Sequence, residues 1–262
     1  MTDRPTVLIV EDDESTAAAT AYHLAKAGYA ASVSRDGLAA IAALKSWQPD
    51  ALVLDLMLPH RDGWGVIREV RRWAPHLPVI IMTARADADR GEAMRLGADD
   101  LLRKPFPARD LLARLEVILR RADMRVPADA VGAPVGDLEI DRTGREVRVA
   151  GSPVALTPLE TTLLWILMDG RGRTVTRDEI FDQVWGGARR RGDRSVDVLV
   201  RRLRRKVDEA GGAYTYVQTD HGWGYRLEAV PKAFPLPGRR RPQGPTTWTA
   251  STATSSRRLP SS

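Results

Sequence analysis

Along the first 124 residues, short apolar runs alternate with stretches in which apolar residues recur every three or four positions. Five runs occur, namely TVLIV, AASVS, ALVLDL, PVIIMTA and DLLRK, and a helical pattern such as STAAATAYHLAKAG follows each. Near-continuous apolar strands that alternate with helices are typical of a parallel sheet covered on both faces. We therefore predict that residues 1–124 form an α/β domain with a doubly wound, five-stranded parallel sheet.

The pattern changes over residues 135–230. The segments VGDLEID, REVRVAG and SPVAL alternate like strands around the turn signals RTG and GSP. Two helices then begin at capping boxes, one from Thr157 to Glu160 with Pro158 between them and one from Thr176 to Glu179. A third helix has one apolar stripe at helical spacing, formed by Val196, Val200, Leu203 and Val207.

After this helix, YTYVQT and GYRLE flank the turn candidate DHGW. A small sheet, three helices and a terminal hairpin predict an α+β winged helix-turn-helix domain. Residues 122–134 carry Pro and Gly without a clear period, so we place a linker at 125–134. Residues 231–262 are rich in Pro, Ser, Thr and Arg, which predicts a disordered basic tail.

Composition excludes several classes of protein. There is no cysteine, so disulfides and thiolate metal sites are excluded, as fits a reducing compartment. The N-terminus MTDRPTVLIV lacks the basic and long apolar regions of a secretory signal. No apolar run approaches the roughly 20 residues that a spanning helix needs. We expect a soluble, cytoplasmic protein that does not bind membranes.

The distribution of charge favours nucleic acid as a partner. The formal net charge is +6, but residues 189–206 alone hold nine basic and two acidic side chains. A focused basic patch on a helix indicates a polyanion partner better than net charge does. We expect Arg202, Val198 and Leu199 to face the DNA groove and read bases. We expect phosphate or other DNA contacts from Arg194, Arg201, Arg204, Arg205 and Lys206.

Polar residues also stand out at the ends of the predicted parallel strands. Glu11 and Asp12 follow the first strand, Asp55 and Thr83 lie near the ends of the third and fourth, and Lys104 follows the fifth. Ligands of parallel sheets collect at the carboxyl ends of the strands. Each residue alone has an ordinary structural explanation, such as a place at a helix N-terminus, in a turn or directly after a strand. Their joint occurrence indicates a site.

The residue types in this set suit a divalent cation and a phosphoryl group. Carboxylates and phosphate oxygens are ligands that Mg²⁺ prefers, and Asp55 can attack phosphorus to give an aspartyl phosphate. Thr83 can hydrogen-bond one phosphoryl oxygen and Lys104 can pair with another. A phosphatase with an aspartate nucleophile needs a second Asp two residues later, where this chain has Met57. Nucleotide-binding loops of the forms GxxxxGK[ST] and GxGxxG are absent, so we do not expect an enzyme.

The motifs VLIVEDDE, LVLDLMLPHRDGWGVI, IIMTAR, GADDLLRKPF and RSVDVLVRRLRRKV resemble those of bacterial two-component response regulators of the OmpR/PhoB type. The resemblance implies a flavodoxin-like receiver domain followed by a winged-helix DNA-binding domain. It implies that Asp55 accepts a phosphoryl group from a sensor histidine kinase. It further implies that Asp12, Asp55 and the Met57 carbonyl bind Mg²⁺, with Glu11 acting through water, and that Thr83 and Lys104 switch the domain.

The family also forms homodimers through receiver ion pairs before binding promoter DNA. By the resemblance, the residues for such pairs here are Arg90 with Asp110, Asp100 with Arg114, and Asp99 with Arg121. A loop at Arg189, Arg190 and Arg191 corresponds to one that touches RNA polymerase in activators of the family, and it is more basic here.

Two positions depart from the family's usual pattern. Leu101 stands where an aromatic residue commonly couples to the switch hydroxyl, and His221 stands at the tip of the wing where an arginine commonly enters the minor groove. The first departure leaves open a second hypothesis, namely a receiver that controls DNA without phosphorylation.

Overall fold

The computed structural model of the chain leaves the expected tail and nearly all of the expected linker outside the residues that it describes, which are 4–85, 90–123, 134–141, 146–170, 172–187, 189 and 192–232. For residues 121–123 it describes the backbone alone. The linker and the disordered tail therefore stay predictions.

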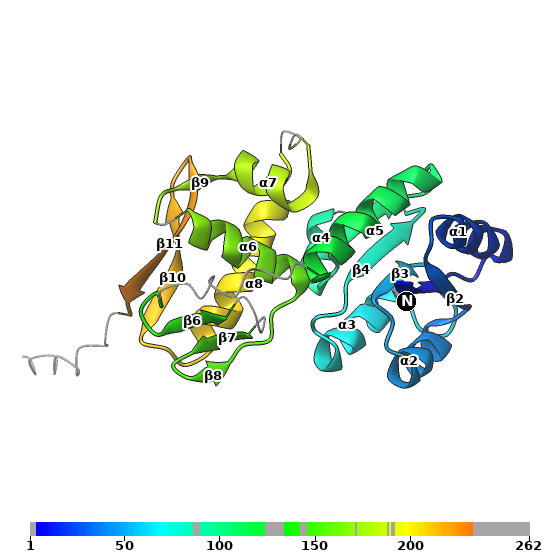
Figure 1. Cartoon of the computed structure of the whole chain (residues 1–262), viewed down its shortest axis with the longest axis horizontal. Coiled ribbons are helices and arrows are strands. Elements are labelled where there is room, and N and C mark those ends of the chain that lie inside the picture. The colour runs from blue at the N-terminus through cyan, green and yellow to red at the C-terminus, as the bar shows by residue number, and fades with distance from the viewer. Residues whose placement is uncertain are drawn as a thin grey trace, which may run out of the picture. The chain divides into compact units, whose positions relative to one another are not determined.

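The first domain is built on five parallel strands in the order β2-β1-β3-β4-β5. These are β1 (Thr6–Val10), β2 (Ala30–Ser34), β3 (Ala51–Asp55), β4 (Val79–Thr83) and β5 (Asp100–Arg103), labelled in Figure 1 where there is room. Since β1 has β2 on one side and β3 on the other, the order of strands reverses next to β1. Such a reversal is where ligands of open α/β sheets bind.

Five helices cover this sheet: α1 (Glu14–Lys26), α2 (Gly37–Ser46), α3 (Gly63–Trp73), α4 (Arg90–Leu96) and α5 (Ala108–Asp123). Side chains alternate between the two faces of a strand. Accordingly, Val7 and Ile9 pack with buried residues of α1 and α5, while Leu8 and Val10 pack with those of α2, α3 and α4. In Figure 1, α1 and α5 lie above the sheet and α2 and α3 below it. The predicted doubly wound domain is confirmed.

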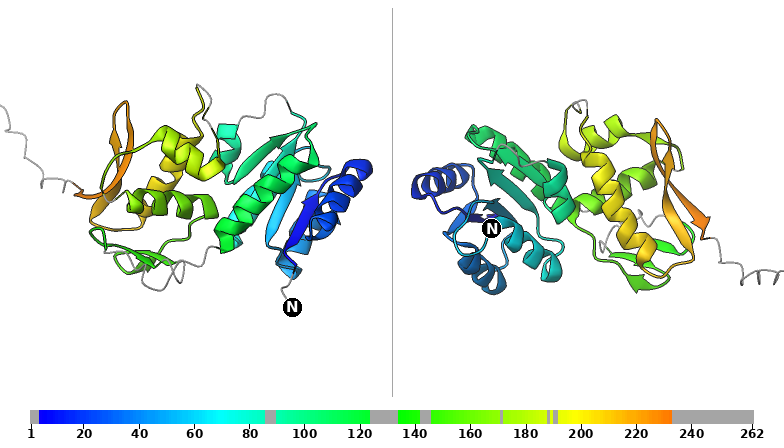
Figure 2. Two further views of the ribbon diagram at one scale, coloured as in Figure 1. Left: turned by 45° about the horizontal axis from the view of Figure 1, so that its top comes forward. Right: turned by 180° about the vertical axis from the view of Figure 1, so that it is seen from behind.

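The second domain begins with an antiparallel sheet of β6 (Leu138–Asp141), β7 (Glu146–Val149) and the short β8 (Ser152–Pro153). Three helices follow, α6 (Pro158–Asp169), α7 (Arg177–Trp185) and α8 (Ser195–Glu209). The hairpin of β10 (Tyr214–Asp220) and β11 (Gly224–Pro231) pairs with β9 (Val175–Thr176). Figure 2 shows α8, in yellow, beside the hairpin, in orange. The winged helix-turn-helix prediction is confirmed.

Local signals in the sequence start the helices of this domain where they were expected. Thr157 and Thr176 each accept a hydrogen bond from the backbone of the glutamate three residues later, and each glutamate side chain accepts one from the cap's backbone. Each box satisfies two backbone N–H groups that the first turn leaves without partners. On α8 the stripe of Val196, Val200, Leu203 and Val207 is buried, which orients that helix.

Candidate functional site

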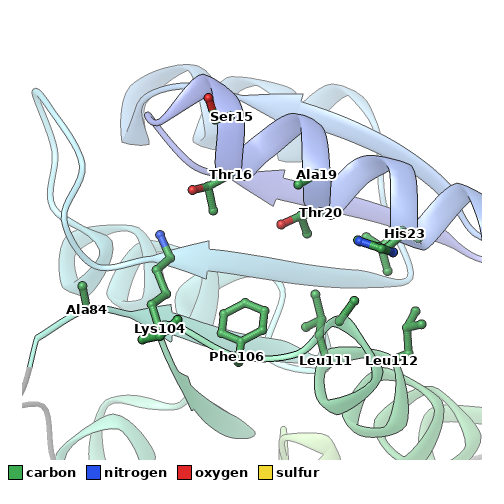
Figure 3. A pocket seen from close by; sticks show the side chains of 13 residues that line it. Ser15, Thr16, Ala19, Thr20, His23, Ala84, Lys104, Phe106, Leu111 and Leu112 are labelled. Atoms are coloured by element: carbon green, nitrogen blue, oxygen red, sulfur yellow. The ribbon is translucent and has the colours of Figure 1, made fainter.

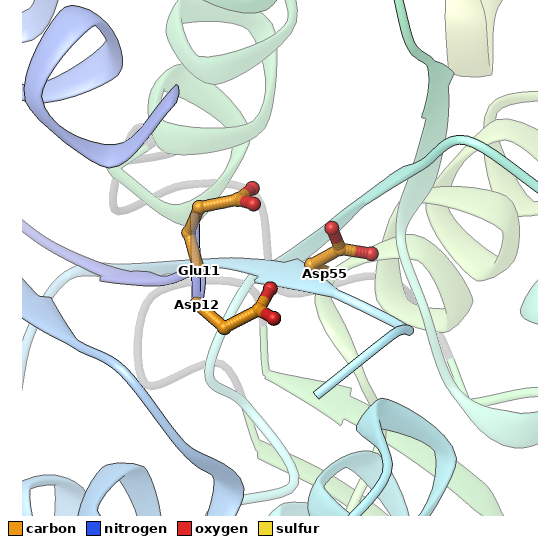
Figure 4. Close-up of side chains that lie close together, drawn as sticks. All are labelled: Glu11, Asp12 and Asp55. Atoms are coloured by element: carbon orange, nitrogen blue, oxygen red, sulfur yellow. The ribbon is translucent and has the colours of Figure 1, made fainter. Parts of the chain in front are cut away.

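Three carboxylates meet at the carboxyl ends of β1 and β3. Glu11 and Asp12 directly follow β1, and Asp55 is the last residue of β3. Each offers an oxygen that lies within 4.8 Å of the others, and Figure 4 shows the three side chains converging. Glu11 and Asp55 are buried and Asp12 is exposed. The three carboxylates lie together as the sequence predicts, because adjacent parallel strands end at the same edge of the sheet.

This arrangement suits a small, hard cation. Two ligands on opposite sides of Mg²⁺ at about 2.1 Å are about 4.2 Å apart, close to the observed spread of the carboxylate oxygens. Asp12, being exposed, leaves room for the waters that Mg²⁺ retains. The loop after β3 folds back on the site, since the Met57 backbone N–H donates to Asp55 Oδ1 at 3.0 Å. Coordination by the Met57 carbonyl stays a prediction.

Lys104 supplies the positive charge of the site. Its Nζ donates to Glu11 Oε2 and Asp55 Oδ2. Burial alone would lower the pKa of Lys104, but the hydrogen bonds to Asp55 and Glu11 outweigh it and raise the pKa above its ordinary value. Burial raises the pKa of Glu11, although Lys104 opposes that shift. Lys104 therefore stays an ammonium at neutral pH and partly neutralises the carboxylates.

Thr83 ends β4 and is fully buried. The strand register pairs Asp55 with Met82, so Thr83 lies one residue beyond the level of Asp55. Its Oγ1 accepts a hydrogen bond from the Arg85 backbone N–H at 3.1 Å. This contact orients the hydroxyl and leaves its hydrogen free to donate. A Thr83 contact to a phosphoryl oxygen is compatible with this geometry and stays a prediction.

A cavity of about 550 Å³ lies between α1 and α5 beside this site. Figure 3 shows Lys104 on its wall together with Thr16 and Thr20 of α1, Phe106, and Leu111 of α5. Most of the residues that line the cavity are apolar. The cavity adjoins the acidic cluster because Lys104, one of the lining residues, donates to Asp55. The cavity offers no further carboxylate, so the metal-binding groups are those at the strand ends.

In the second domain, α8 presents a basic face. Arg194, Arg201 and Arg205 are exposed, and none of their side chains has a recorded hydrogen bond or ion pair within the described parts of the chain. At 100° per residue, Arg201 and Arg205 lie on the side of α8 opposite its buried stripe. Exposed guanidinium groups on one helix face can bind the phosphates of nucleic acid.

Comparisons with known proteins match both halves of the chain. Residues 7–116 match the family described as "Response regulator receiver domain", and residues 151–227 match "Transcriptional regulatory protein, C terminal". The "Sensory transduction protein RegX3" of Mycolicibacterium smegmatis is 40% identical over 228 residues, which cover 85% of this chain and 98% of that protein. The chain belongs to the response regulators of the OmpR/PhoB type.

Further relatives agree with this assignment. The "Response regulator MprA" of Mycobacterium avium is 36% identical over 226 residues, which cover 86% of this chain and 99% of that protein. The solved structure of a RitR mutant covers 86% of this chain and 99% of its own with a TM-score of 0.68, and at 24% identity it supports the fold alone. This response regulator is thus a DNA-binding regulator of transcription in a two-component system, and its family is not a class of enzymes. None of the described helices combines the length and apolar character that crossing a bilayer requires.

The structure corrects part of the predicted DNA face. Leu199 is fully buried in the core, so the expectation that it meets a thymine methyl is wrong for this structure. Arg202 is held by Glu160 of α6 and by Thr157, the residue that caps α6, with Nε 2.9 Å from Glu160 Oε1. Arg204 binds the hairpin, and Lys206 binds Glu160 Oε2 at 2.6 Å and the Ala155 carbonyl. These three cations therefore have protein acceptors in place of phosphates or bases.

Of the remaining expected DNA contacts, Val198 is half-buried, and Arg194, Arg201, Arg205 and His221 are exposed. DNA binding by these residues stays a prediction. The basic loop is described only at Arg189, which donates to Asp178 and to the Asp193 carbonyl. Arg190 and Arg191 lie outside the described residues.

Glu160 links the first helix of the winged domain to its last. Its carboxylate accepts from Arg202, Lys206 and the Thr157 backbone N–H, while it is fully buried. Burial alone would raise the pKa of Glu160, but Arg202 and Lys206 outweigh it and lower the pKa below its ordinary value. The carboxylate must therefore be ionised to stabilise the fold.

Replacing Glu160 with glutamine should destabilise the second domain by about 1 to 3 kcal/mol at neutral pH, because two cations lose a charged acceptor. A lowered pKa gives stability that is present above the ordinary value of 4.5 and is lost as the pH falls through the folded-state value. The difference between wild type and Glu160→Gln should shrink on acidification. Urea titrations at several pH values measure the free energy of unfolding of both proteins. A difference between them that does not change with pH would contradict the role of an ionised Glu160.

The expected dimer residues are also engaged within the chain. Asp99 is fully buried, and its Oδ2 accepts from Arg71 Nη2 at 2.9 Å and from the Val79 backbone N–H at 2.8 Å. Asp99 is thus paired within its own domain, and the Arg121 side chain lies outside the described part, so their pairing across a dimer stays a prediction. Asp100 pairs with Arg90 and Arg114 of the same chain. Asp110 Oδ1 lies 3.7 Å from Nε of Arg109. No contact between Asp110 and Arg90 is seen within the chain.

Proposed function

We propose that this response regulator is switched by phosphorylation of Asp55. A sensor histidine kinase donates the phosphoryl group, the receiver then forms a homodimer, and the second domain binds promoter DNA in the cytoplasm. The observation that carries the proposal is the convergence of Glu11, Asp12 and Asp55 with Lys104 at one edge of the sheet. Two buried carboxylates that share one cation are costly for the fold, which favours a chemical role.

The chemistry follows from the contacts of each group. A carboxylate oxygen of Asp55 attacks phosphorus, an O–P bond forms, and the bond from phosphorus to the donor's histidine nitrogen breaks with its electron pair. Mg²⁺ held by Glu11, Asp12 and Asp55 would neutralise charge on the phosphoryl oxygens. Lys104 already donates to Asp55 Oδ2, so it can also donate to an oxygen of a phosphoryl group attached to Asp55. Thr83 can donate its hydroxyl hydrogen to another.

A small phosphodonor tests the whole proposal without the kinase. Acetyl phosphate with Mg²⁺ should add one phosphate to the protein, convert monomer to dimer and raise affinity for duplex DNA about tenfold or more, because two linked domains bind two half-sites. Intact mass, light scattering and DNA titration measure the three changes. EDTA is the control and should prevent all of them. No mass change with Mg²⁺ present would refute phosphorylation as the switch.

A second hypothesis is a regulator whose DNA binding does not respond to phosphate. Leu101, in place of the family's usual aromatic residue, is buried in β5 among core residues and carries no ring that could move. If the protein binds duplex DNA but takes up no phosphate, or takes it up while oligomeric state and DNA affinity stay constant, this hypothesis replaces the first. Neither hypothesis changes the assignment to the family.

A further inference from the structure

A second cavity, of about 570 Å³, lies at the amino ends of the strands of the first domain. Arg4 and Pro5, which precede β1, line it together with residues 48–50, which precede β3, and residues 73–78, which precede β4. The carboxylates of the proposed phosphorylation site lie at the other ends of these strands, so the two sites are separate. Binding sites for small molecules commonly have volumes of about 300 to 1,000 Å³.

Hydrogen bonds within the domain hold the wall formed by residues 73–78. Arg71 Nη1 donates to the Leu77 carbonyl at 2.6 Å and to the Pro75 carbonyl at 3.3 Å. The same guanidinium is fixed from its other side, because its Nε donates to the Gly97 carbonyl at 2.8 Å and its Nη2 to Asp99 at 2.9 Å. The connection from α3 to β4 is therefore ordered before any ligand binds.

Asp50 is held on the cavity wall in a similar way. Its Oδ2 accepts from the Thr6 backbone N–H at 2.7 Å and from the Thr6 hydroxyl at 2.8 Å, and its backbone N–H donates to the Thr6 carbonyl at 2.9 Å. Pro49 and Pro78 of the lining are buried, and their rings restrict the backbone further. A cavity with ordered walls loses little conformational entropy when a ligand binds.

Several polar groups of the lining keep free hydrogen-bonding capacity. Asp50 Oδ1 has no recorded hydrogen bond, and the exposed side chains of Arg4 and Gln48 have no recorded hydrogen bond or ion pair among the described residues. Trp73, the last residue of α3, exposes 36% of its surface at the cavity. Prolines and leucines make up most of the rest of the lining. The cavity thus combines a carboxylate, a guanidinium, an amide and an aromatic ring.

A purine nucleotide offers a complementary group to each of these side chains. Its flat base can stack on the Trp73 indole, as bases stack on aromatic side chains of nucleic-acid-binding proteins. N–H groups at the edge of the base can donate to Asp50 Oδ1, and the Gln48 amide can both donate to that edge and accept from it. The phosphate can pair with the Arg4 guanidinium. A simple inorganic anion would use Arg4 alone and would be repelled by Asp50.

We propose that this cavity binds a free purine nucleotide, with Trp73 stacking on the base, Asp50 and Gln48 binding its edge and Arg4 binding the phosphate. The site goes beyond the proposed phosphorylation and DNA binding and depends on neither. Because an arginine pairs with the phosphate, the site needs no metal ion. Binding in the presence of a chelator therefore distinguishes this site from the carboxylates at the other end of the sheet.

Calorimetric titration of the full chain with GMP and with AMP, in the presence of EDTA, tests the proposal. At least one of the two should bind with a stoichiometry of one nucleotide per chain. Trp73→Ala should lower the affinity about tenfold or more, because the stacked base loses its platform, whereas Trp73→Phe should keep most of the affinity. Gln48→Ala should also weaken binding. Trp223→Ala removes an exposed tryptophan from the second domain, and this matched control should bind like the wild type.

Arg4 allows the phosphate contact to be tested apart from the base. Arg4→Ala should weaken binding of the nucleotide about tenfold and leave binding of the corresponding nucleoside unchanged, because only the nucleotide carries the charged partner. Ribose 5-phosphate, which lacks the base, should show no saturable binding. The proposal is wrong if ribose 5-phosphate binds as tightly as the nucleotides or if Trp73→Ala binds them like the wild type. The absence of saturable binding of both GMP and AMP at millimolar concentrations would overturn it as well.

Discussion

Replacing Asp55 with asparagine should abolish phosphoryl uptake from acetyl phosphate, because an amide lacks the nucleophilic carboxylate that forms the acyl phosphate. The wild type should gain the mass of one phosphate in the presence of Mg²⁺, and the variant should gain none. The side chains are nearly equal in size, so circular dichroism should show the same fold for both. Asp55 is buried beside Lys104 and Glu11, and none of the neighbouring carboxylates has the same place at the end of β3.

The matched control for this variant lies at the other end of the same strand. Asp50 precedes β3, is exposed and accepts hydrogen bonds from the Thr6 backbone and hydroxyl, far along the strand from the acidic cluster. Asp50→Asn should therefore accept phosphate as the wild type does. Labelling of Asp55→Asn to the wild-type extent would move the phosphoacceptor to another residue and remove the basis of the proposed switch.

The acidic cluster could be predicted from the sequence because its geometry follows from strand order and period. Parallel strands that are buried on both faces read as continuous apolar runs, and a charge is tolerated at their ends. Glu11, Asp12 and Asp55 stand at such ends, so knowledge of the sheet was sufficient to bring them together. The buried stripe of α8 was predictable for the same reason, since it depends only on the helical period.

The partners of charged residues could not be predicted in this way. A helical pattern places Arg202 and Lys206 on the flank of α8, but their acceptor Glu160 lies 42 and 46 residues earlier on another helix. Likewise Asp99 Oδ2 accepts a hydrogen bond from Arg71, 28 residues away on α3. A run of arginines therefore predicts a basic helix correctly and overstates how many of its charges remain free for DNA.

Removing the two exposed arginines of α8 together should cause the second large effect. Arg201→Ala with Arg205→Ala should weaken binding to duplex DNA by at least about a hundredfold at low salt, since each charged hydrogen bond contributes about 1.5 to 3 kcal/mol and 1.4 kcal/mol is tenfold. The slope of log affinity against log salt should fall by about two, because two phosphate contacts no longer release counterions. Neither side chain has a recorded hydrogen bond or ion pair within the described structure, so the unfolding temperature should stay unchanged.

The control for this double variant removes two positive charges from another part of the protein. Arg72 and Arg109 of the first domain are both highly exposed, with 76% and 86% of their side-chain surface accessible. Arg72→Ala with Arg109→Ala removes the same two charges without touching α8. If binding depended on overall charge alone, the two double variants would weaken it equally. A loss confined to Arg201 and Arg205 would locate the DNA contact on the exposed face of α8, and equal losses would show that this face has no special role.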